Sequence, residues 1–454
     1  MPTSINRNFD NYVKKHYTEN PTPNLVAALV NQNSVLHHVA FNLPQNKMTT
    51  NPLTTQFRIA SMTKPFTALS LLQLRDSGKL TLDHKIKYYL PWLNENWDGI
   101  TIKHALTMRS GFSKDDPWAD RTLNHSNQEI ESRFNQFRPI YKPDIHYQYN
   151  NLGYMILGKI ISQVSGLSLE EYMKSHIFKP LGMKNTGFNF SKNCSSVKGY
   201  QKQGSVHPDA FVESTYFNIH NDYAGFGGLC STIEDLQKFI GFYLNKDNQT
   251  FSEVLSLQSR REAQRFSQVN SLYDYRQENA GVLPESYGYG LRNFAYNGEI
   301  FSGHAGGIPG FNSFMLWSQK YNIGIIALNN CTGPNVWLMC LNWMKSYSLA
   351  MTRYNTLSNI DQAIHKRGEQ ILKLIKHWDK DLTNLMFAEN MFLDYDMDTL
   401  KQGLASILDS TKLSIVWDRH LNGIIVQNST STPIITFTLS PLGDNKIQSL
   451  ELLG

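Results

Sequence analysis

Apolar positions in the first 80 residues follow two patterns, one typical of strands and one typical of a helix. Residues 24–41 contain two apolar runs separated by a polar turn at 31–33, which predicts a pair of adjacent strands. Residues 62–76 carry apolar side chains at helical spacing, which predicts a helix. Pro65 fits only the first turn of a helix and Gly78 fits a helix end, so these residues limit the helix on both sides.

Helical patterns fill the middle of the chain before strand patterns return. Helices are expected at 102–110 and 152–164 and after the capping residues Ser168 and Thr232. Residues 246–286 are polar and irregular, which predicts a loop-rich insertion near a cleft. Strands are expected again at 311–317 and 323–328. This order implies an α+β fold, with a mostly antiparallel sheet closed by the two ends of the chain and a helical cluster.

The pattern changes once more near Tyr354. Apolar residues recur at helical spacing from Ile360 to Trp378, and further helical stretches run to Ile407. Four period-two segments then follow at 413–417, 423–426, 434–439 and 448–452. We therefore expect a main domain at 1–353 and a small C-terminal α+β domain at 354–454, in which no chemical motif is visible.

Composition and charge narrow the classes of partner. Of the 454 residues, 41% are hydrophobic and 18% are charged, which is ordinary for a folded protein. Lys and Arg number 43 and Asp and Glu number 38, so the net charge is +5, without a dense basic block. Nucleic acid is therefore not expected as a partner. The four cysteines form no C-x-x-C pair, and no H-x-H or H-E-x-x-H pattern occurs, so we expect neither a metal nor a cofactor.

The chain has no apolar run that matches a membrane helix, which needs about 18–20 residues. The longest candidate, residues 336–344, contains Asn342 and is far shorter. Residues 1–20 are polar and lack the apolar core of a signal peptide. We therefore expect a cytoplasmic chain as written, or a periplasmic or secreted protein if a signal peptide has been removed.

The strongest candidates for chemistry are Ser61 and Lys64, at the start of the predicted helix. A serine hydroxyl is a weak nucleophile until a base accepts its proton. Residues i and i+3 share a helix face, and burial or a neighbouring cation lowers the pKa of a lysine, which makes the neutral amine available. The spacing alone is weak evidence, because Ser195 and Lys198 repeat it in a predicted loop. Taken alone, it fits a helix N-cap with a solvated lysine better.

Further motifs accompany this pair in order along the chain. The segments concerned are 57–64, 80–83, 100–111, 149–151, 178–183, 227–232 and 303–307. Together they resemble the superfamily of class C β-lactamases, penicillin-binding D-alanyl-D-alanine carboxypeptidases and family VIII esterases, from about Leu25 to Asn330. The resemblance implies a β-lactamase/transpeptidase-like fold and a serine hydrolase that forms an acyl-enzyme.

The resemblance also implies a role for each residue of the first motifs. Ser61 would form the acyl-enzyme, and Lys64 would take the proton of its hydroxyl. Tyr149 would be a second proton carrier, which serves the leaving group and the water of deacylation. Asn151 would hold Lys64 and the substrate by hydrogen bonds. A Tyr-x-Asn sequence on its own more often marks an ordinary helix start.

A glycine-rich segment falls where the family has Lys-Thr-Gly or His-Thr-Gly. The resemblance places His304, Ala305 and Gly306 on a strand beside the cleft. It also implies an oxyanion hole formed by the N–H groups of Ser61 and Gly307, in which each donor contributes about 3–4 kcal/mol. Gly306 and Gly307 are expected to let a substrate come close to this strand.

Two residues depart from the β-lactamase pattern. His304 replaces a lysine, so no permanent charge faces a substrate carboxylate, and Ala305 replaces a threonine whose hydroxyl helps to bind that carboxylate. We therefore expect a small-molecule or peptide substrate, with esters and carboxylate-free amides preferred. The alternatives are a D-alanyl-D-alanine carboxypeptidase or weak β-lactamase, and a non-catalytic penicillin-binding-like protein. The natural substrate and the oligomeric state are left open.

Overall fold

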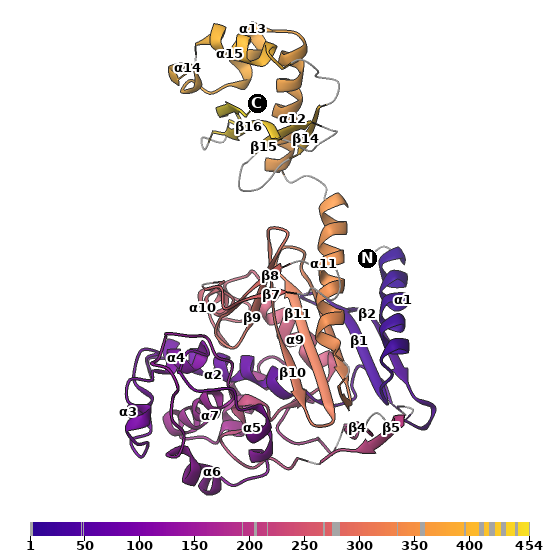
Figure 1. Cartoon of the computed structure of the whole chain (residues 1–454), viewed down its shortest axis with the longest axis vertical. Helices are drawn as coiled ribbons and strands as arrows, with labels where there is room; N and C mark the ends of the chain where they lie inside the picture. Colours follow the sequence, from indigo (N-terminus) through magenta and orange to yellow (C-terminus); the bar gives the residue numbers. More distant parts are fainter. Residues whose placement is uncertain are drawn as a thin grey trace. The chain divides into compact units, whose positions relative to one another are not determined.

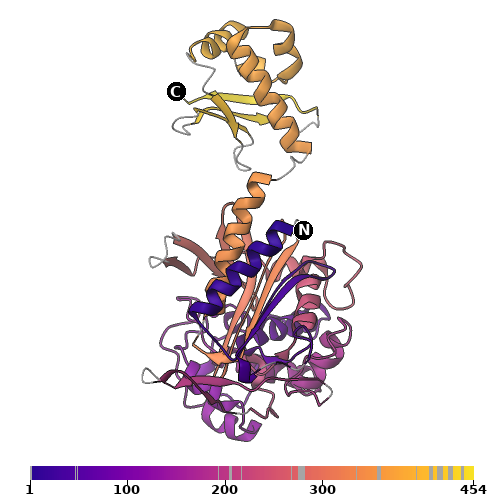
Figure 2. The ribbon, with the colours of Figure 1, turned by 90° about the vertical axis from the view of Figure 1, so that its right-hand side faces the viewer.

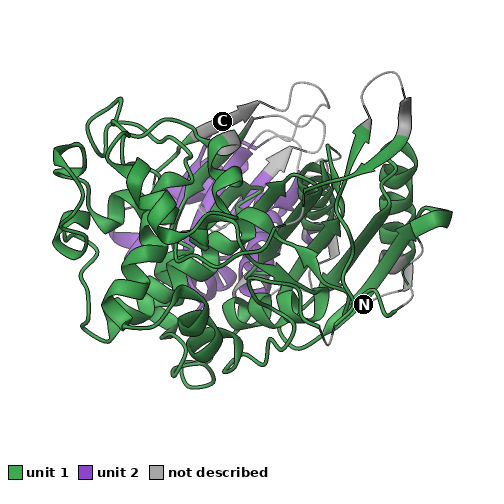
Figure 3. Ribbon diagram, turned by 90° about the horizontal axis from the view of Figure 1, so that it is seen from below, with its two compact units in different colours: residues 1–349 green, residues 350–454 purple. Residues whose placement is uncertain are grey.

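The computed structural model describes residues 3–453, apart from 47, 49, 193, 204–206, 216, 267, 275–281, 334, 355–358, 395, 408–412, 417–422, 428–432 and 441–443. Two compact units divide the chain, Met1–Leu349 and Ala350–Gly454 (Figure 3). Each unit has an apolar core of its own. The change of sequence pattern near Tyr354 lies close to this division.

An eight-stranded antiparallel sheet forms the centre of the first unit (Figure 1). In spatial order its strands are β2 (Val35–Asn42), β1 (Asn24–Val30), β12 (Ile323–Asn329), β11 (Phe311–Ser318), β10 (Glu299–Ile308), β9 (Arg292–Tyr296), β8 (Val282–Tyr287) and β7 (Ser271–Asp274). β1 pairs with β12, so that Ala27 lies opposite Ala327. Strands from the two ends of the unit therefore pair in one sheet, which confirms the predicted α+β architecture.

Helices cover both faces of this sheet, which is why β1 is buried throughout and apolar at every position after Asn24. Leu25 enters the core beneath α1 (Thr3–Glu19) and α11 (Val336–Tyr354), whereas the next residue, Val26, enters the core of the opposite face. Figures 1 and 2 show α1 and α11 on the same face of the sheet. The helix α1 was not predicted from the sequence, because only a narrow stripe of apolar residues around Phe9 marks an otherwise polar segment.

A cluster of helices covers the other face. Its members are α2 (Lys64–Asp76), α3 (Ile86–Tyr89), α4 (Ile102–Leu106), α5 (Asp116–Thr122), α6 (Asn127–Phe134), α7 (Leu152–Ser165), α8 (Leu169–Met173) and α9 (Ile233–Leu244). The predicted caps Ser168 and Thr232 are confirmed, since each side chain accepts a first-turn N–H, and Thr101 caps α4 in the same way. Within the described ranges no single helix has the length and apolar character to cross a membrane, although the bent pair Leu152–Ser165 and Leu169–Phe178 meets those limits jointly.

The segment 246–286 is more regular than the sequence analysis predicted. It contains α10 (Leu257–Ala263) and the strands β7 and β8, which extend the central sheet beyond β9. The prediction of a loop-rich insertion is wrong for these elements, because pairing such as Ser286 with Asn293 supplies the order that the residue pattern does not reveal. Residues 267 and 275–281 lie outside the described part.

Short elements complete the first unit. They are β3 (Phe57–Arg58) paired with β6 (Cys230–Ser231), the sheet of β4 (Tyr200–Gln203), β5 (His207–Glu213) and β13 (Cys331–Thr332), the 3-10 turns Pro44–Asn46, Ala60–Thr63, Glu95–Trp97 and Ala224–Phe226, and the π-helical turn Lys174–Phe178. The pair β3–β6 lies directly before the turn that contains Ser61. It therefore fixes the entry of the chain into the site.

The second unit is a small α+β fold. Its elements are α12 (Asn359–Lys376), α13 (Lys380–Met386), α14 (Met391–Asp394), α15 (Met397–Ala405), β14 (Leu413–Val416), β15 (Gly423–Gln427), β16 (Pro433–Leu439) and β17 (Ile447–Leu452). The four strands form one antiparallel sheet in chain order. Alternate strand residues such as Ile435 and Phe437 pack with Ile371 of α12 in a separate core. None of the candidate site residues lies in this unit.

Candidate active site

Ser61 lies in a 3-10 turn between β3 and α2 rather than in the first turn of the α-helix. The preceding residue, Ala60, has a left-handed φ of 47°, a conformation that costs a non-glycine residue roughly 1–2 kcal/mol. Its neighbour Ile59 is held on both sides, by its N–H bond to Leu229 O at 3.0 Å and by its carbonyl, which accepts from Ser313 Oγ at 2.7 Å. Surrounding structure therefore imposes the turn that presents Ser61.

Lys64 is completely buried at the start of α2. Its Nζ lies 2.9 Å from Ser61 Oγ, 2.7 Å from Asn151 Oδ1 and 2.8 Å from the backbone carbonyl oxygen of Phe226. Three hydrogen-bond partners thus converge on one buried amine. The structure brings together Ser61, Lys64 and Asn151, which lie up to 90 positions apart in the sequence.

Asn151 is placed by the start of α7. Its own N–H and the N–H of Leu152 each donate to the carboxylate of Asp115 at 2.7 Å. These are among the first N–H groups of the helix, which have no partner within it, so a carboxylate is favoured there. Asp115 could not be predicted from the sequence, because it lies in a polar segment that carries no motif or periodicity.

The half-buried ring of Tyr149 lies between charged groups and other rings. Lys64 Nζ is 4.9 Å from its centroid and the guanidinium carbon of Arg292 is 5.8 Å from it, both within the range of cation–π attraction. The rings of Tyr287 and His304 each lie with their centroids 6.2 Å from that of Tyr149. The structure therefore places the ring of Tyr149 beside the amine of Lys64.

Arg292 on β9 is a cation that the sequence analysis did not identify. Its Nε lies 2.9 Å from a carboxylate oxygen of Glu285, which is almost fully buried on the neighbouring strand β8. This ion pair compensates the guanidinium charge inside the protein. Both residues fall in or beside the segment predicted to be irregular, so no pattern indicated that they would lie near Tyr149.

His304 is 1% exposed and makes hydrogen bonds within the protein through both ring nitrogens. Its Nε2 lies 2.9 Å from the hydroxyl of Tyr287, and its Nδ1 lies 2.6 Å from the carbonyl oxygen of Ala305. Burial is the main cause that holds the pKa of His304 well below its ordinary value of 6.5, followed by the positive charges of protonated Lys64 and of Arg292. The ring is therefore neutral at pH 7, as expected, but it is enclosed rather than open to a substrate.

The side chain of Ala305 lies on the sheet face opposite to that of His304. It lies across from Phe314 and packs with the core beneath α1 and α11, because successive residues of a strand point to opposite faces. This differs from the sequence expectation, in which the missing hydroxyl at position 305 weakened carboxylate binding. A side chain in this orientation does not face Tyr149 or Lys64.

The two glycines of the same strand have different environments. A Cβ at the buried Gly306 would lie 2.1 Å from Ile59 O and 2.3 Å from Ser313 Oγ, so this glycine lets β10 approach the segment before Ser61. The space that we expected to serve a substrate at Gly306 is thus filled by the protein itself. Gly307 is exposed, and a Cβ there would meet only Asn312 Oδ1, at 3.6 Å.

The second S-x-x-K sequence has none of these features. Ser195 lies in a loop, and its carbonyl oxygen accepts from the N–H of Gln56. Lys198 is exposed and pairs with Glu213 at 2.9 Å. The spacing at this second place therefore arises by chance.

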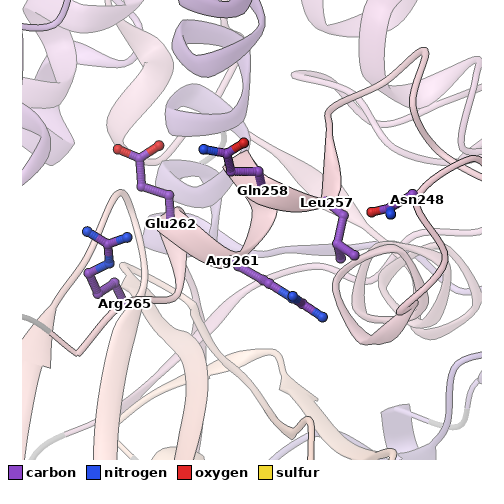
Figure 4. A pocket seen from close by; sticks show the side chains of 6 residues that line it. All are labelled: Asn248, Leu257, Gln258, Arg261, Glu262 and Arg265. Carbon is purple, nitrogen blue, oxygen red and sulfur yellow. The ribbon is translucent and has the colours of Figure 1, made fainter.

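A pocket of about 380 Å³ lies at a different place, around α10. Figure 4 shows its lining residues, Asn248, Leu257, Gln258, Arg261, Glu262 and Arg265. The side chains of Arg261 and Arg265 point in different directions. None of the candidate site residues lines this pocket, so it is separate from the site around Ser61.

Comparisons with known proteins point to one family. The profile of the β-lactamase family matches residues 7–337. Protein flp of Staphylococcus aureus (strain MW2) is 29% identical over 316 residues, which cover 68% of this chain and 59% of flp. Penicillin-binding protein 4* of Bacillus subtilis (strain 168) is 29% identical over 316 residues, which cover 65% of each chain. This chain thus spans less than two thirds of the length of these relatives.

Two solved structures have the same fold. The octameric penicillin-binding protein homologue from Pyrococcus abyssi superposes with a TM-score of 0.64 at 21% identity, and the match covers 97% of this chain and 94% of that one. A D-stereospecific amidohydrolase from Streptomyces sp. superposes with a TM-score of 0.56 at 20% identity and covers 72% and 94%. The family profile itself spans more than half of the sequence, from α1 into α11. This chain belongs to the β-lactamase family.

Proposed function

We propose that this chain is a serine hydrolase that works by acyl transfer, with Ser61 as the nucleophile and Lys64 as the base. The observation that carries this proposal is the set of three contacts of the buried Lys64 amine. An uncharged amine has two N–H donors and one lone pair. Because Asn151 Oδ1 and Phe226 O can only accept hydrogen bonds, both N–H groups are used there. The lone pair is then left for the hydroxyl proton of Ser61.

From this arrangement the chemical steps follow. Ser61 Oγ attacks the acyl carbon as its proton moves to Lys64. The leaving group then departs with a proton that Lys64 or Tyr149 supplies. Tyr149 is proposed as the second carrier, which activates the water that cleaves the acyl-enzyme. The N–H groups of Ser61 and Gly307 are proposed to bind the oxyanion.

The substrate class that fits best is a neutral ester, or an amide without a free carboxylate. His304 carries no charge at pH 7, and Arg292 is compensated by Glu285, so a substrate carboxylate gains no uncompensated cation from either residue. One structural relative is named for D-stereospecific amide hydrolysis, which supports amides as well as esters. The alternatives are cleavage of D-alanyl-D-alanine peptides and weak β-lactam hydrolysis.

An activity panel tests the proposed function. It contains p-nitrophenyl esters, D-amino-acid amides and peptides with and without a free carboxylate, and a chromogenic cephalosporin. Turnover of the esters or neutral amides supports the proposal. Faster turnover of D-alanyl-D-alanine peptides would favour the carboxypeptidase, and absence of all turnover and of covalent labelling would favour a non-catalytic protein.

Substrates with a free carboxylate should be turned over more slowly than neutral esters. We expect wild-type kcat/KM to be higher for a short-chain p-nitrophenyl ester than for the cephalosporin, because a carboxylate gains no uncompensated cation from His304 or Arg292. Ala305→Thr should leave the ratio of the two values unchanged, because its side chain lies on the sheet face opposite to that of His304. A wild type that prefers the cephalosporin would contradict the prediction.

The chemistry should be retained without the second unit. The residues proposed for acyl transfer lie between Ser61 and Gly307, and the chain 1–354 keeps α11, whose residues Val336 and Met344 belong to the core of the first unit. We expect this truncated chain to fold and to react at Ser61 with a small ester or fluorophosphonate. Intact-mass analysis and thermal unfolding measure both properties. A folded truncated chain that fails to react would show that the second unit contributes to the site.

A further inference from the structure

The hydrogen bonds of His304 define the position of its proton. The carbonyl oxygen of Ala305 can only accept, so Nδ1, at 2.6 Å from it, must carry a hydrogen. In a neutral ring the other nitrogen, Nε2, is then an acceptor. Its partner at 2.9 Å is the hydroxyl of Tyr287, which must therefore donate. The two contacts together select one neutral tautomer.

Tyr287 can serve as this donor over a wide pH range. Its side chain is 3% exposed, and burial, followed by the neighbouring tyrosines Tyr154 and Tyr149, raises its pKa well above 10. The hydroxyl of Tyr154 donates to Leu106 O at 2.8 Å, and Tyr154 lies close enough to Tyr287 to raise its pKa. Because Tyr154 lies in α7, shortly after Asn151, these contacts join β8 and β10 to the helix that positions Asn151.

The same two rings border Tyr149. The T-shaped contact of Tyr149 with Tyr287 and the tilted contact with His304 have equal centroid distances of 6.2 Å. Tyr287 and His304 in turn meet edge to face at 5.8 Å. Three rings thus form one packed group, with Lys64 Nζ at 4.9 Å from the Tyr149 centroid. A movement of one ring changes the place of Tyr149 relative to Lys64.

We propose that Tyr287 is a positioning residue of the acyl-transfer site, whose hydroxyl holds His304 in one neutral tautomer so that the two rings keep Tyr149 beside Lys64. This rests on the proposed function of Ser61 and Lys64. It assigns His304 to the support of Tyr149 rather than to contact with substrate.

The charged groups around His304 explain why its neutral form matters. Lys64 on α2 and Arg292 on β9 both lower its pKa, and Glu285 on β8 pairs with Arg292. The other two titratable groups whose rings contact His304 in the described part of the chain belong to Tyr149 and Tyr287. A protonated His304 would add a cation beside Lys64 and would lose its acceptor at Nε2. Removal of the Tyr287 hydroxyl takes away a hydrogen bond to the neutral form, so the pKa of His304 should rise.

Tyr287→Phe tests this role against the matched control Tyr243→Phe. Tyr243 is another buried tyrosine, but its hydroxyl has no hydrogen-bond partner in the described part of the chain. For Tyr287→Phe we expect kcat for a p-nitrophenyl ester to fall about tenfold or more, with KM changed less than kcat. The acidic limb of the kcat/KM profile should move to higher pH. The control should keep the wild-type profile.

Nitrogen-15 NMR of the histidine rings gives a readout that is independent of catalysis, with His304 assigned by its loss in His304→Gln. In the wild type we expect the neutral Nδ1–H tautomer from about pH 6 to 9, and in Tyr287→Phe a shifted Nε2 signal and protonation at higher pH. A wild-type His304 that is charged, or protonated at Nε2, would overturn the proposal. So would a Tyr287→Phe enzyme with an unchanged kcat and pH profile. Failure of the proposed function is seen separately, as a wild type that does not label at Ser61.

Discussion

Replacement of Ser61 by Ala is expected to abolish hydrolysis and covalent labelling while the fold is kept. The change removes one oxygen atom from a half-buried position, and the core packing of the turn does not depend on it. Loss of a serine nucleophile in other hydrolases costs up to about 10⁶-fold in kcat, so activity should fall to background. Ester hydrolysis, intact-mass analysis after reaction with a fluorophosphonate, and thermal unfolding measure these three properties.

Ser195→Ala is the matched control for this experiment, because Ser195 has the same spacing to a lysine as Ser61. It lies in a loop, and its lysine, Lys198, is paired with Glu213 in solvent. We expect this variant to keep the wild-type rate and to label fully. A Ser61→Ala protein that still labels, with the label lost in Ser195→Ala, would reverse the assignment.

Replacement of Lys64 by Arg is expected to lower kcat by roughly 10³-fold or more. Arginine stays charged at every accessible pH, so it has no lone pair with which to accept the Ser61 proton, and general-base catalysis alone contributes about 10²- to 10⁴-fold. The planar guanidinium must also fit a closed space built around the three hydrogen-bond partners of the Lys64 amine. Rates measured from about pH 6 to 10 should stay low throughout, because no pH in this range neutralises arginine.

Lys198→Arg controls for the chemical change from lysine to arginine and should be neutral. Thermal unfolding of Lys64→Arg shows whether the larger side chain is accommodated. A folded Lys64→Arg protein with a rate near that of the wild type, or one whose rate recovers as the pH rises, would contradict the role of Lys64 as the base.

Much of the first unit could be predicted from sequence because its elements carry strong local signals. The first strand is apolar at every position from 25 to 30, since helices cover both faces of the sheet, and Ser168 and Thr232 are caps with clear spacing. The helix α1 has only a narrow apolar stripe around Phe9, and the strands β7 and β8 acquire their order from pairing beside β9. Elements that are stabilised by residues far away in the sequence are hard to predict from the local pattern of apolar and polar residues.

The same distinction applies to the candidate site. The motifs that contain Ser61, Lys64 and Asn151 identify residues whose side chains the structure brings within hydrogen-bond distance. Asp115 and Tyr287 act through contacts that only the fold creates, and neither belongs to a motif.

Strand direction also decides which motif residues can face the chemistry. The side chains of His304 and Ala305 point to opposite faces of β10, although they are neighbours in the motif. Gly306 gives space to the backbone before Ser61 rather than to a substrate. A motif therefore predicts which residues lie close together in the fold, but not which of their side chains face the reacting groups.

The most direct test of the central claim is to locate the covalent adduct. The wild-type protein is treated with a fluorophosphonate, digested, and analysed by mass spectrometry, with Lys64→Arg treated in parallel. Acyl transfer through Ser61 and Lys64 predicts one added mass per chain, on the peptide that contains Ser61, and little or none in Lys64→Arg at equal times. An adduct on another residue of the wild type, or a wild type that stays unmodified while folded, would contradict the assignment.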